Sequence, residues 1–274
     1  MYRRLLRTWS SWSVLFLCSR VSLGDVPSPI QVEDYQGAIR VACVGDSITA
    51  GVGAKAGASY PVQLGAMLGS PWEVGNFGVS NATLLNHGDL PYQQQRAFRA
   101  ALDYQPHVVI ICLGANDTKP LNWKFNNAFA ADYKGLIEKF AALPSKPRIF
   151  LCHPIPVSGP GNYGITGQGV RQIIPMIDEI AREVNAGVID MFGALRDHPE
   201  TLRDHVHPNA VGAWLMAKAA YKTLTGKDHQ GKPPWDTRDY AALLAASVGG
   251  AALLLLMALL QKHEKSRRVQ KSSS

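Results

Sequence analysis

Short apolar runs recur along the chain, and each is followed by a longer stretch in which apolar residues return at helical spacing. The runs have the length and composition of strands buried on both faces of a sheet. They cover residues 39–44, 72–77, 108–113, 148–152 and 187–191. The helical stretches cover residues 60–68, 93–104, 128–143, 170–185 and 209–224. Strand and helix therefore alternate, which predicts an α/β fold with a five-stranded parallel sheet between two layers of helices.

In a parallel sheet of this kind, functional residues gather at the carboxyl ends of the strands. The polar segments of interest are therefore those that follow the predicted strands, together with the one that precedes the last helix. They are residues 45–49, 76–80, 114–117 and 204–208. All four are expected to converge on one edge of the sheet.

Three polar residues in these segments have the chemistry of nucleophilic catalysis. Ser47 stands where the first strand turns into a helix, and the backbone N–H groups and helix dipole there favour a nearby oxyanion. Asp204 lies three residues before His207 and can hold one imidazole nitrogen, which leaves the other to take a proton from a serine. Taken singly, each residue also fits a plain structural role, because Ser often caps helices and Asp and His are common in solvated turns.

An oxyanion needs hydrogen-bond donors that are already in place, and two further residues fit that need. Gly78 permits close approach of its backbone, and the side-chain amide of Asn116 offers an N–H. Each also has an ordinary explanation, because glycine at a strand end favours a tight turn and asparagine there favours a cap. Asp46 and Asp117 are assigned to loop geometry rather than to chemistry.

A second serine competes with Ser47 as the nucleophile. Residues 78–82 nearly match the G-x-S-x-G pattern of a nucleophile on a sharp strand-to-helix turn, with Ser80 at the centre. The last position holds Ala82 instead of glycine, and this alternative leaves the turn at residues 45–47 without a purpose. We therefore rank Ser80 second.

Four short blocks in chain order resemble the SGNH (GDSL-type) hydrolase superfamily. They are Gly45-Asp46-Ser47, Gly78, Gly114-x-Asn116-Asp117 and Asp204-x-x-His207, and the similarity spans roughly residues 38–225. The resemblance implies a flavodoxin-like three-layer α/β/α sandwich that uses no cofactor. It also implies a catalytic triad of Ser47, Asp204 and His207, and an oxyanion hole formed by Ser47, Gly78 and Asn116.

The loop after the fourth predicted strand points to a particular group within this superfamily. Residues 152–156, 163–167 and 171–175 resemble exported bacterial proteins described as sialate O-acetylesterase-like or as carbohydrate acetylesterases. His153 and Tyr163 are candidate substrate contacts, although a structural role fits each of them at least as well. The glycines on either side of Pro160 suit a mobile loop over the site.

Together these features predict a serine esterase that hydrolyses O-acyl esters, above all O-acetyl esters of carbohydrates, through an acyl-enzyme. Two alternatives stay open. A lipid-directed esterase would use a membrane tether to bring its site near acyl chains. A membrane-tethered glycan-binding module would keep the same fold without turnover.

Composition and charge remove several other classes of protein. The chain has 274 residues, of which 46% are hydrophobic and 18% charged, and this excludes a disordered chain. The net charge of +7 comes from the two ends, before residue 25 and after residue 261, so the body gives no reason to expect a nucleic-acid partner. The cysteines at positions 43, 112 and 152 lie in predicted strands, and no metal-ligand spacing such as C-x-x-C is present.

Both ends of the chain are predicted to be targeting segments. Residues 1–24 combine early arginines with a short apolar run, as a cleavable signal peptide does. Residues 25–225 form the predicted hydrolase domain, and residues 226–239 form a stalk. Residues 240–261 are uncharged and long enough to span a bilayer, and the basic residues 262–274 would then lie in the cytoplasm. The catalytic domain is thereby expected in the periplasm or at the cell surface.

Overall fold

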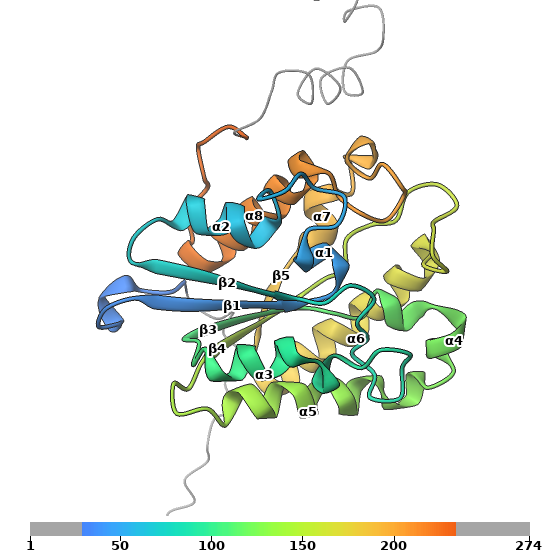
Figure 1. Ribbon diagram of the computed structural model, residues 1–274, viewed down its shortest axis with the longest axis horizontal. Coiled ribbons are helices and arrows are strands. Elements are labelled where there is room, and N and C mark those ends of the chain that lie inside the picture. The colour runs from blue at the N-terminus through green and yellow to red at the C-terminus, as the bar shows by residue number, and fades with distance from the viewer. Residues whose placement is uncertain (1–28, 234–274) are drawn as a thin grey trace, which may run out of the picture.

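The central sheet follows from the apolar runs of the sequence, and it contains five parallel strands (Figure 1). In chain order they are β1 (Ile39–Gly45), β2 (Trp72–Gly78), β3 (Val108–Cys112), β4 (Arg148–Cys152) and β5 (Gly187–Ile189). Their order across the sheet is β2-β1-β3-β4-β5, and every neighbouring pair is parallel. This is the flavodoxin-like strand order, so the predicted α/β class and the five-stranded parallel sheet are confirmed.

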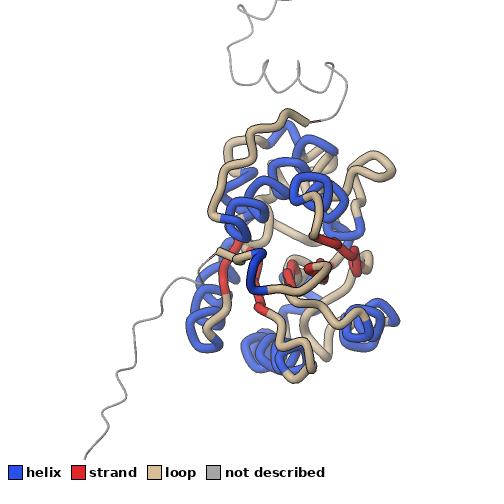
Figure 2. The backbone as a smooth tube through the Cα atoms, turned by 90° about the vertical axis from the view of Figure 1, so that its left-hand side faces the viewer, coloured by secondary structure: helices blue, strands red, loops and turns tan. Residues whose placement is uncertain are grey.

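Helices cover both faces of the sheet, which makes three layers (Figures 1 and 2). One face is covered by α2 (Tyr60–Leu68), α7 (Met191–Leu195) and α8 (Ala210–Thr225). The opposite face is covered by α3 (Arg96–Asp103), α5 (Phe129–Ala141) and α6 (Gly167–Val184). Two short helices, α1 (Ser47–Ala50) and α4 (Pro120–Trp123), follow the carboxyl ends of β1 and β3.

The central strand β3 shows how the two hydrophobic cores are divided. All five of its residues are buried, and successive side chains point to opposite faces of the sheet. Val108, Ile110 and Cys112 pack in the core beneath α2, α7 and α8. Val109 and Ile111 pack in the core beneath α3, α5 and α6. Burial on both faces explains why this strand is a continuous apolar run in the sequence rather than an alternating one.

The fifth strand ends two residues earlier than predicted. β5 ends at Ile189, and the Asp190 carboxylate accepts a hydrogen bond of 2.8 Å from the N–H of Gly193. This side chain caps α7, so Met191 begins a helix instead of ending a strand. The helix predicted to start at residue 93 likewise starts later, at Arg96, because Tyr92–Gln94 forms a separate 3₁₀ turn.

The computed structural model describes residues 29–233. The predicted signal peptide, membrane-spanning helix and basic tail therefore lie outside the described residues. Nearly all of the predicted hydrolase domain lies within them. No helix in residues 29–233 has both the length and the apolar character that crossing a bilayer requires.

Candidate active site

Ser47 is the first residue of α1, two residues after β1 ends at Gly45. The preceding residue, Asp46, caps this helix by accepting a 2.9 Å hydrogen bond from the N–H of Ile48. An N–H at the first position of a helix has no acceptor within the helix, so that of Ser47 is left for another partner. Because α1 has only four residues, its dipole is small, and the local N–H groups matter more than the dipole that the sequence suggested.

The three predicted triad residues form one hydrogen-bonded chain. Ser47 Oγ lies 2.9 Å from Nε2 of His207. The other ring nitrogen of His207, Nδ1, lies 2.6 Å from Oδ2 of Asp204. Since an ionised carboxylate only accepts hydrogen bonds, Nδ1 carries the proton and the unprotonated Nε2 accepts the hydroxyl proton of Ser47. This arrangement can activate a serine for attack on a carbonyl carbon.

Asp204 is held as an anion by the turn that it starts. Its Oδ1 accepts hydrogen bonds from the backbone N–H of Val206 at 3.1 Å and of His207 at 2.6 Å. Burial raises the pKa of Asp204, but the N–H and imidazole of His207 together with the N–H of Val206 outweigh it and bring the pKa to about 2. The carboxylate therefore stays charged beside the imidazole at all physiological pH values.

Ser80, the competing serine, and His205, which lies two residues before His207, are both outside this hydrogen-bonded chain. Ser80 is exposed in the turn that follows β2, and the imidazole of His207 faces Ser47 instead. His205 has a left-handed backbone with φ of 72°, and its Nδ1 lies 3.1 Å from the hydroxyl of Ser158. The structure thus pairs His207 with Ser47 and turns His205 away from it.

Gly78 lies beside Ser47 because of the register of the sheet. It is opposite Gly45 in the β1–β2 pair, and the N–H of Val79 bonds the carbonyl of Gly45 at 2.9 Å. A Cβ at position 78 would collide with the backbone of Thr49 and Ala50, so only glycine lets β2 pack this closely on α1. The N–H of Gly78 donates to the side chain of Asn76 at 3.0 Å in this structure.

Asn116 lies next to Asp46 at the start of the 3₁₀ turn that follows β3. Its side-chain Nδ2 donates to Oδ2 of Asp46 at 3.3 Å and to the carbonyl of Ala82 at 3.2 Å. Both N–H bonds are long, and the residue is only 3% exposed. Asn116 is thus close to the Ser47 turn, as predicted, but its amide protons are occupied. The bond to Asp46 was not expected from the sequence.

The two aspartates assigned to loop geometry both hold backbone N–H groups. Asp117 accepts from the N–H of Leu84 at 3.0 Å and of Leu85 at 2.7 Å, and so fixes the loop after β2. Burial raises the pKa of Asp117 to about 7 and that of Asp46 to about 6, although backbone hydrogen bonds oppose the rise in both. Their contacts agree with the structural role predicted for them.

The two candidate substrate contacts have different surroundings. Tyr163 lies beside the triad, with its ring centroid 5.4 Å from that of His207. His153 instead lies between two carboxylates: its Nε2 is 2.8 Å from Asp178 and its Nδ1 is 3.1 Å from Asp190. Both ring nitrogens of His153 are engaged, which leaves neither for a substrate.

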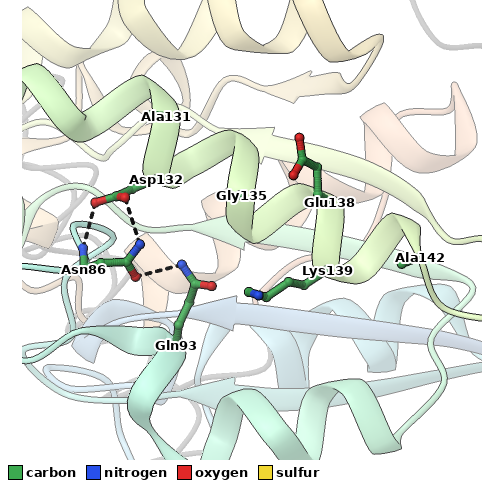
Figure 3. Close-up of a pocket in the computed structure, with 8 residues that line it drawn as sticks. All are labelled: Asn86, Gln93, Ala131, Asp132, Gly135, Glu138, Lys139 and Ala142. Atoms are coloured by element: carbon green, nitrogen blue, oxygen red, sulfur yellow. Dashed lines mark hydrogen bonds between the residues drawn. The ribbon is translucent and has the colours of Figure 1, made fainter.

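Two cavities of about 420 Å³ each lie elsewhere on the described surface. The first lies between α5 and the loop after β2, and its residues Asn86, Gln93 and Asp132 hydrogen-bond to one another (Figure 3). The second lies near Ile30, Trp72 and other residues at the amino ends of the strands. No triad residue lines either cavity.

A parallel α/β sheet with a serine, a histidine and an aspartate in one hydrogen-bonded chain is an arrangement found in several classes of serine hydrolase. The model of the GDSL-like lipase/acylhydrolase family matches residues 43–215, and the chain belongs to this family. An acetylxylan esterase from Xylanibacter ruminicola is 38% identical over 217 residues, which cover 72% of this chain. The chain spans only 44% of the length of that relative.

Solved structures share the same fold at lower identity. An acetyl xylan esterase is 22% identical with a TM-score of 0.56, and the match covers 68% of this chain and 100% of the other. An aryl esterase from M. smegmatis is 18% identical with a TM-score of 0.55, over 68% of this chain and 98% of the other. A carbohydrate acetylesterase from Sinorhizobium meliloti is 17% identical with a TM-score of 0.54, over 68% and 97%.

Proposed function

We propose that this protein is a serine esterase that removes O-acetyl groups from carbohydrates through an acyl-enzyme. The observation that carries the proposal is the 2.9 Å contact between Ser47 Oγ and Nε2 of His207, whose Nδ1 is held by Asp204. The relative that is 38% identical is an acetylxylan esterase, which supports an acetylated sugar as the substrate.

In the first half of the reaction, Ser47 Oγ attacks the carbonyl carbon of the ester while His207 Nε2 takes the hydroxyl proton. The bond between the carbonyl carbon and the sugar oxygen then breaks. His207 returns the proton to that oxygen, and Ser47 is left acetylated. In the second half, His207 takes a proton from water, the water attacks the acyl-enzyme, acetate leaves and Ser47 regains its proton.

The oxyanion of each tetrahedral intermediate needs donors beside Ser47. The N–H of Ser47 has no acceptor within α1 and is the first donor. The N–H of Gly78 and the amide of Asn116 are the second and third. Because Gly78 bonds Asn76, and Asn116 bonds Asp46 and Ala82, these two donors exchange a resting hydrogen bond for the oxyanion when it forms.

The two other functions expected from the sequence have less support. A lipid-directed esterase is less well supported because the relative that is 38% identical is an acetylxylan esterase and not a lipid esterase. A glycan-binding module without turnover has no need for the complete chain from Asp204 through His207 to Ser47.

The test is acetate release by the full chain from acetylated xylan and from an acetylated monosaccharide, with butyryl and octanoyl esters of the same sugar for comparison. We expect turnover of the acetyl esters and a steep fall with acyl length. Faster turnover of the octanoyl ester would favour the lipid-directed alternative. Binding of the sugar without any release of acetate would favour the binding module.

We also propose that the domain is exported and attached to a membrane. The support is in the sequence alone, in the signal-like residues 1–24 and the uncharged residues 240–261. In a host that exports it, the protein should stay in the membrane fraction after alkaline carbonate extraction, and protease added outside should reach residues 29–233. Release into the soluble fraction by carbonate would contradict the anchor.

A further inference from the structure

An exposed tyrosine lies directly against the triad. Tyr163 is 55% exposed, and its ring is tilted 57° from that of His207 at a centroid distance of 5.4 Å. Its hydroxyl donates to Oδ2 of Asp204 at 3.2 Å, the same oxygen that holds Nδ1 of His207. The negative charge of Asp204 raises the pKa of Tyr163, so the hydroxyl keeps its proton and remains a donor.

The loop that carries Tyr163 is tied to the triad turn rather than free above it. Asn162 pairs with Ile165 across the loop tip, and its side chain donates to the carbonyl of Asp204 at 3.2 Å. The N–H of Ser158 donates to the carbonyl of His205 at 3.0 Å. The sequence suggested a mobile loop here, but these bonds give the loop a defined position over the end of the triad.

The backbone at Tyr163 is unusual as well. Its φ is 55°, a left-handed conformation that is unfavourable for a bulky side chain. The structure therefore keeps a large ring exposed, on a strained backbone, at a defined position beside His207. Residues held in such conformations cluster where a ligand is gripped.

The direction of proton transfer decides which part of an ester this ring can touch. His207 Nε2 must return its proton to the oxygen of the leaving alcohol, so that alcohol lies beside the imidazole. The acyl group lies on the other side of the carbonyl carbon. Because Tyr163 flanks the imidazole, we expect its ring to be nearer to the alcohol than to the acyl group of a bound ester.

We propose that Tyr163 is the platform on which the sugar ring that bears the acetyl ester packs, and so selects the alcohol part of the substrate. The inference rests on the proposed esterase function. A pyranose ring presents C–H groups on its faces, which pack on an aromatic ring as apolar surface, while its hydroxyls remain in water. The loop also comes close to the start of α4, since a Cβ on Gly164 would contact the side chains of Lys119 and Pro120.

Two substitutions at position 163 distinguish the contribution of the aromatic ring from those of the hydroxyl group and of the backbone conformation. Tyr163→Asn removes the ring, and asparagine tolerates the left-handed conformation, so the loop can keep its shape. Tyr163→Phe keeps the ring and removes the bond to Asp204. Lys146→Asn is the matched control, because Lys146 also has a left-handed backbone, with φ of 46°, but lies before the amino end of β4.

The experiment compares an acetylated xylo-oligosaccharide with ethyl acetate, which has the same acyl group and no ring in its alcohol. For Tyr163→Asn we expect kcat/KM on the sugar ester to fall by about 10- to 100-fold, mainly through KM, with ethyl acetate changed less than about threefold. Tyr163→Phe should keep the wild-type KM for the sugar ester. Lys146→Asn should match the wild type on both esters.

Three results would overturn the inference. One is an equal loss by Tyr163→Asn on both esters, which would make Tyr163 a positioning residue for the triad. Another is wild-type kinetics of Tyr163→Asn on the sugar ester, which would remove Tyr163 from the substrate site while the esterase function stands. The third is a wild-type enzyme that releases no acetate from the sugar, which would remove the proposed function together with the inference.

Discussion

His153 directly follows β4, and His207 lies shortly before α8. Both histidines contact carboxylates, but the partners of their second ring nitrogens differ. His207 has one nitrogen on Asp204 and the other on the hydroxyl of Ser47. His153 has one nitrogen on Asp190 and the other on Asp178. Only the first arrangement leaves a nitrogen that can exchange a proton with a substrate. A histidine beside an aspartate is therefore a catalytic base or a structural tie according to what its second nitrogen meets.

The two aspartates show a related difference in charge stabilisation. Asp204 accepts hydrogen bonds at both oxygens from its own turn, and its pKa falls to about 2 despite the opposing effect of burial. Burial also raises the pKa of Asp190, but the N–H of Gly193 and the imidazole of His153 lower it by more. Asp204 holds the imidazole whose other nitrogen faces Ser47, whereas Asp190 caps α7 and is linked through His153 to Asp178 on α6.

The largest expected effect is a difference in kcat between the alanine variants of His207 and His153. His207→Ala should lower kcat by about 10⁶-fold, because the serine loses its base. His153→Ala should leave kcat near the wild-type value and lower the free energy of unfolding by about 1 kcal/mol through its lost hydrogen bonds. Steady-state kinetics and urea denaturation of both variants make the measurement. A loss of kcat in His153→Ala with unchanged stability would break the comparison.

The next largest effect is a difference in kcat between the asparagine variants of Asp204 and Asp190. Asp204→Asn should lower kcat by about 10⁴-fold, because an amide can donate to Nδ1 and thereby favour the wrong tautomer of His207. Asp190→Asn is the control, since asparagine caps helices as well as aspartate does and α7 should persist. Kinetics on an aryl acetate, with circular dichroism to confirm folding, test the pair. Similar kcat values for the two variants would contradict the role given to Asp204.

A smaller effect concerns the oxyanion donors. Asn116→Ala should lower kcat by about 10²- to 10³-fold with little change in KM, because the amide acts mainly in the transition state. Asn126→Ala is the control, since Asn126 is exposed and bonds only the carbonyl of Trp123 among the contacts described. Near-normal kcat in Asn116→Ala would show that the amide of Asn116 does not stabilise the oxyanion. Its role would then be limited to the hydrogen bonds with Asp46 and Ala82.

The smallest expected effect is on the pH dependence of the stability that His153 provides by linking Asp190 to Asp178. The pKa of Asp190 is lowered in the folded protein, so its ionised form stabilises the fold above the ordinary aspartate pKa of about 4, and this contribution is lost as the pH falls through the lower folded value. The difference in unfolding free energy between wild type and His153→Ala should therefore be larger at pH 6 than at pH 3. Denaturation curves at several pH values measure it. A difference that grows on acidification would contradict the sign.

Most of the fold was predictable, because buried parallel strands are continuous apolar runs. β3 and β4 follow directly from such runs, and the order of strand and helix leaves few topologies. The end of β5 was predicted wrongly because Ile189 continues into the apolar Met191. The signal that ends the strand is the capping side chain of Asp190, three residues before Gly193, which an alternation of apolar residues does not reveal.

The triad contacts were predictable for a different reason. Ser47 and the pair Asp204 and His207 lie after a strand and before a helix that meet at the same edge of a parallel sheet, so topology brings them together. The bond between Asn116 and Asp46, and the bond of His153 to Asp178, depend on loop shape and helix rotation. No local sequence signal marks these contacts, because their partners come from different segments of the chain.

The central claim is that Ser47, and not Ser80, is the nucleophile. A fluorophosphonate probe, which forms a covalent bond with an activated serine, should label the wild-type chain once, on the tryptic peptide that contains Ser47. Mass spectrometry should find the same label in Ser80→Ala, none in Ser47→Ala and almost none in His207→Ala. A label that persists in Ser47→Ala and disappears in Ser80→Ala, or steady acetate release by Ser47→Ala, would contradict the account.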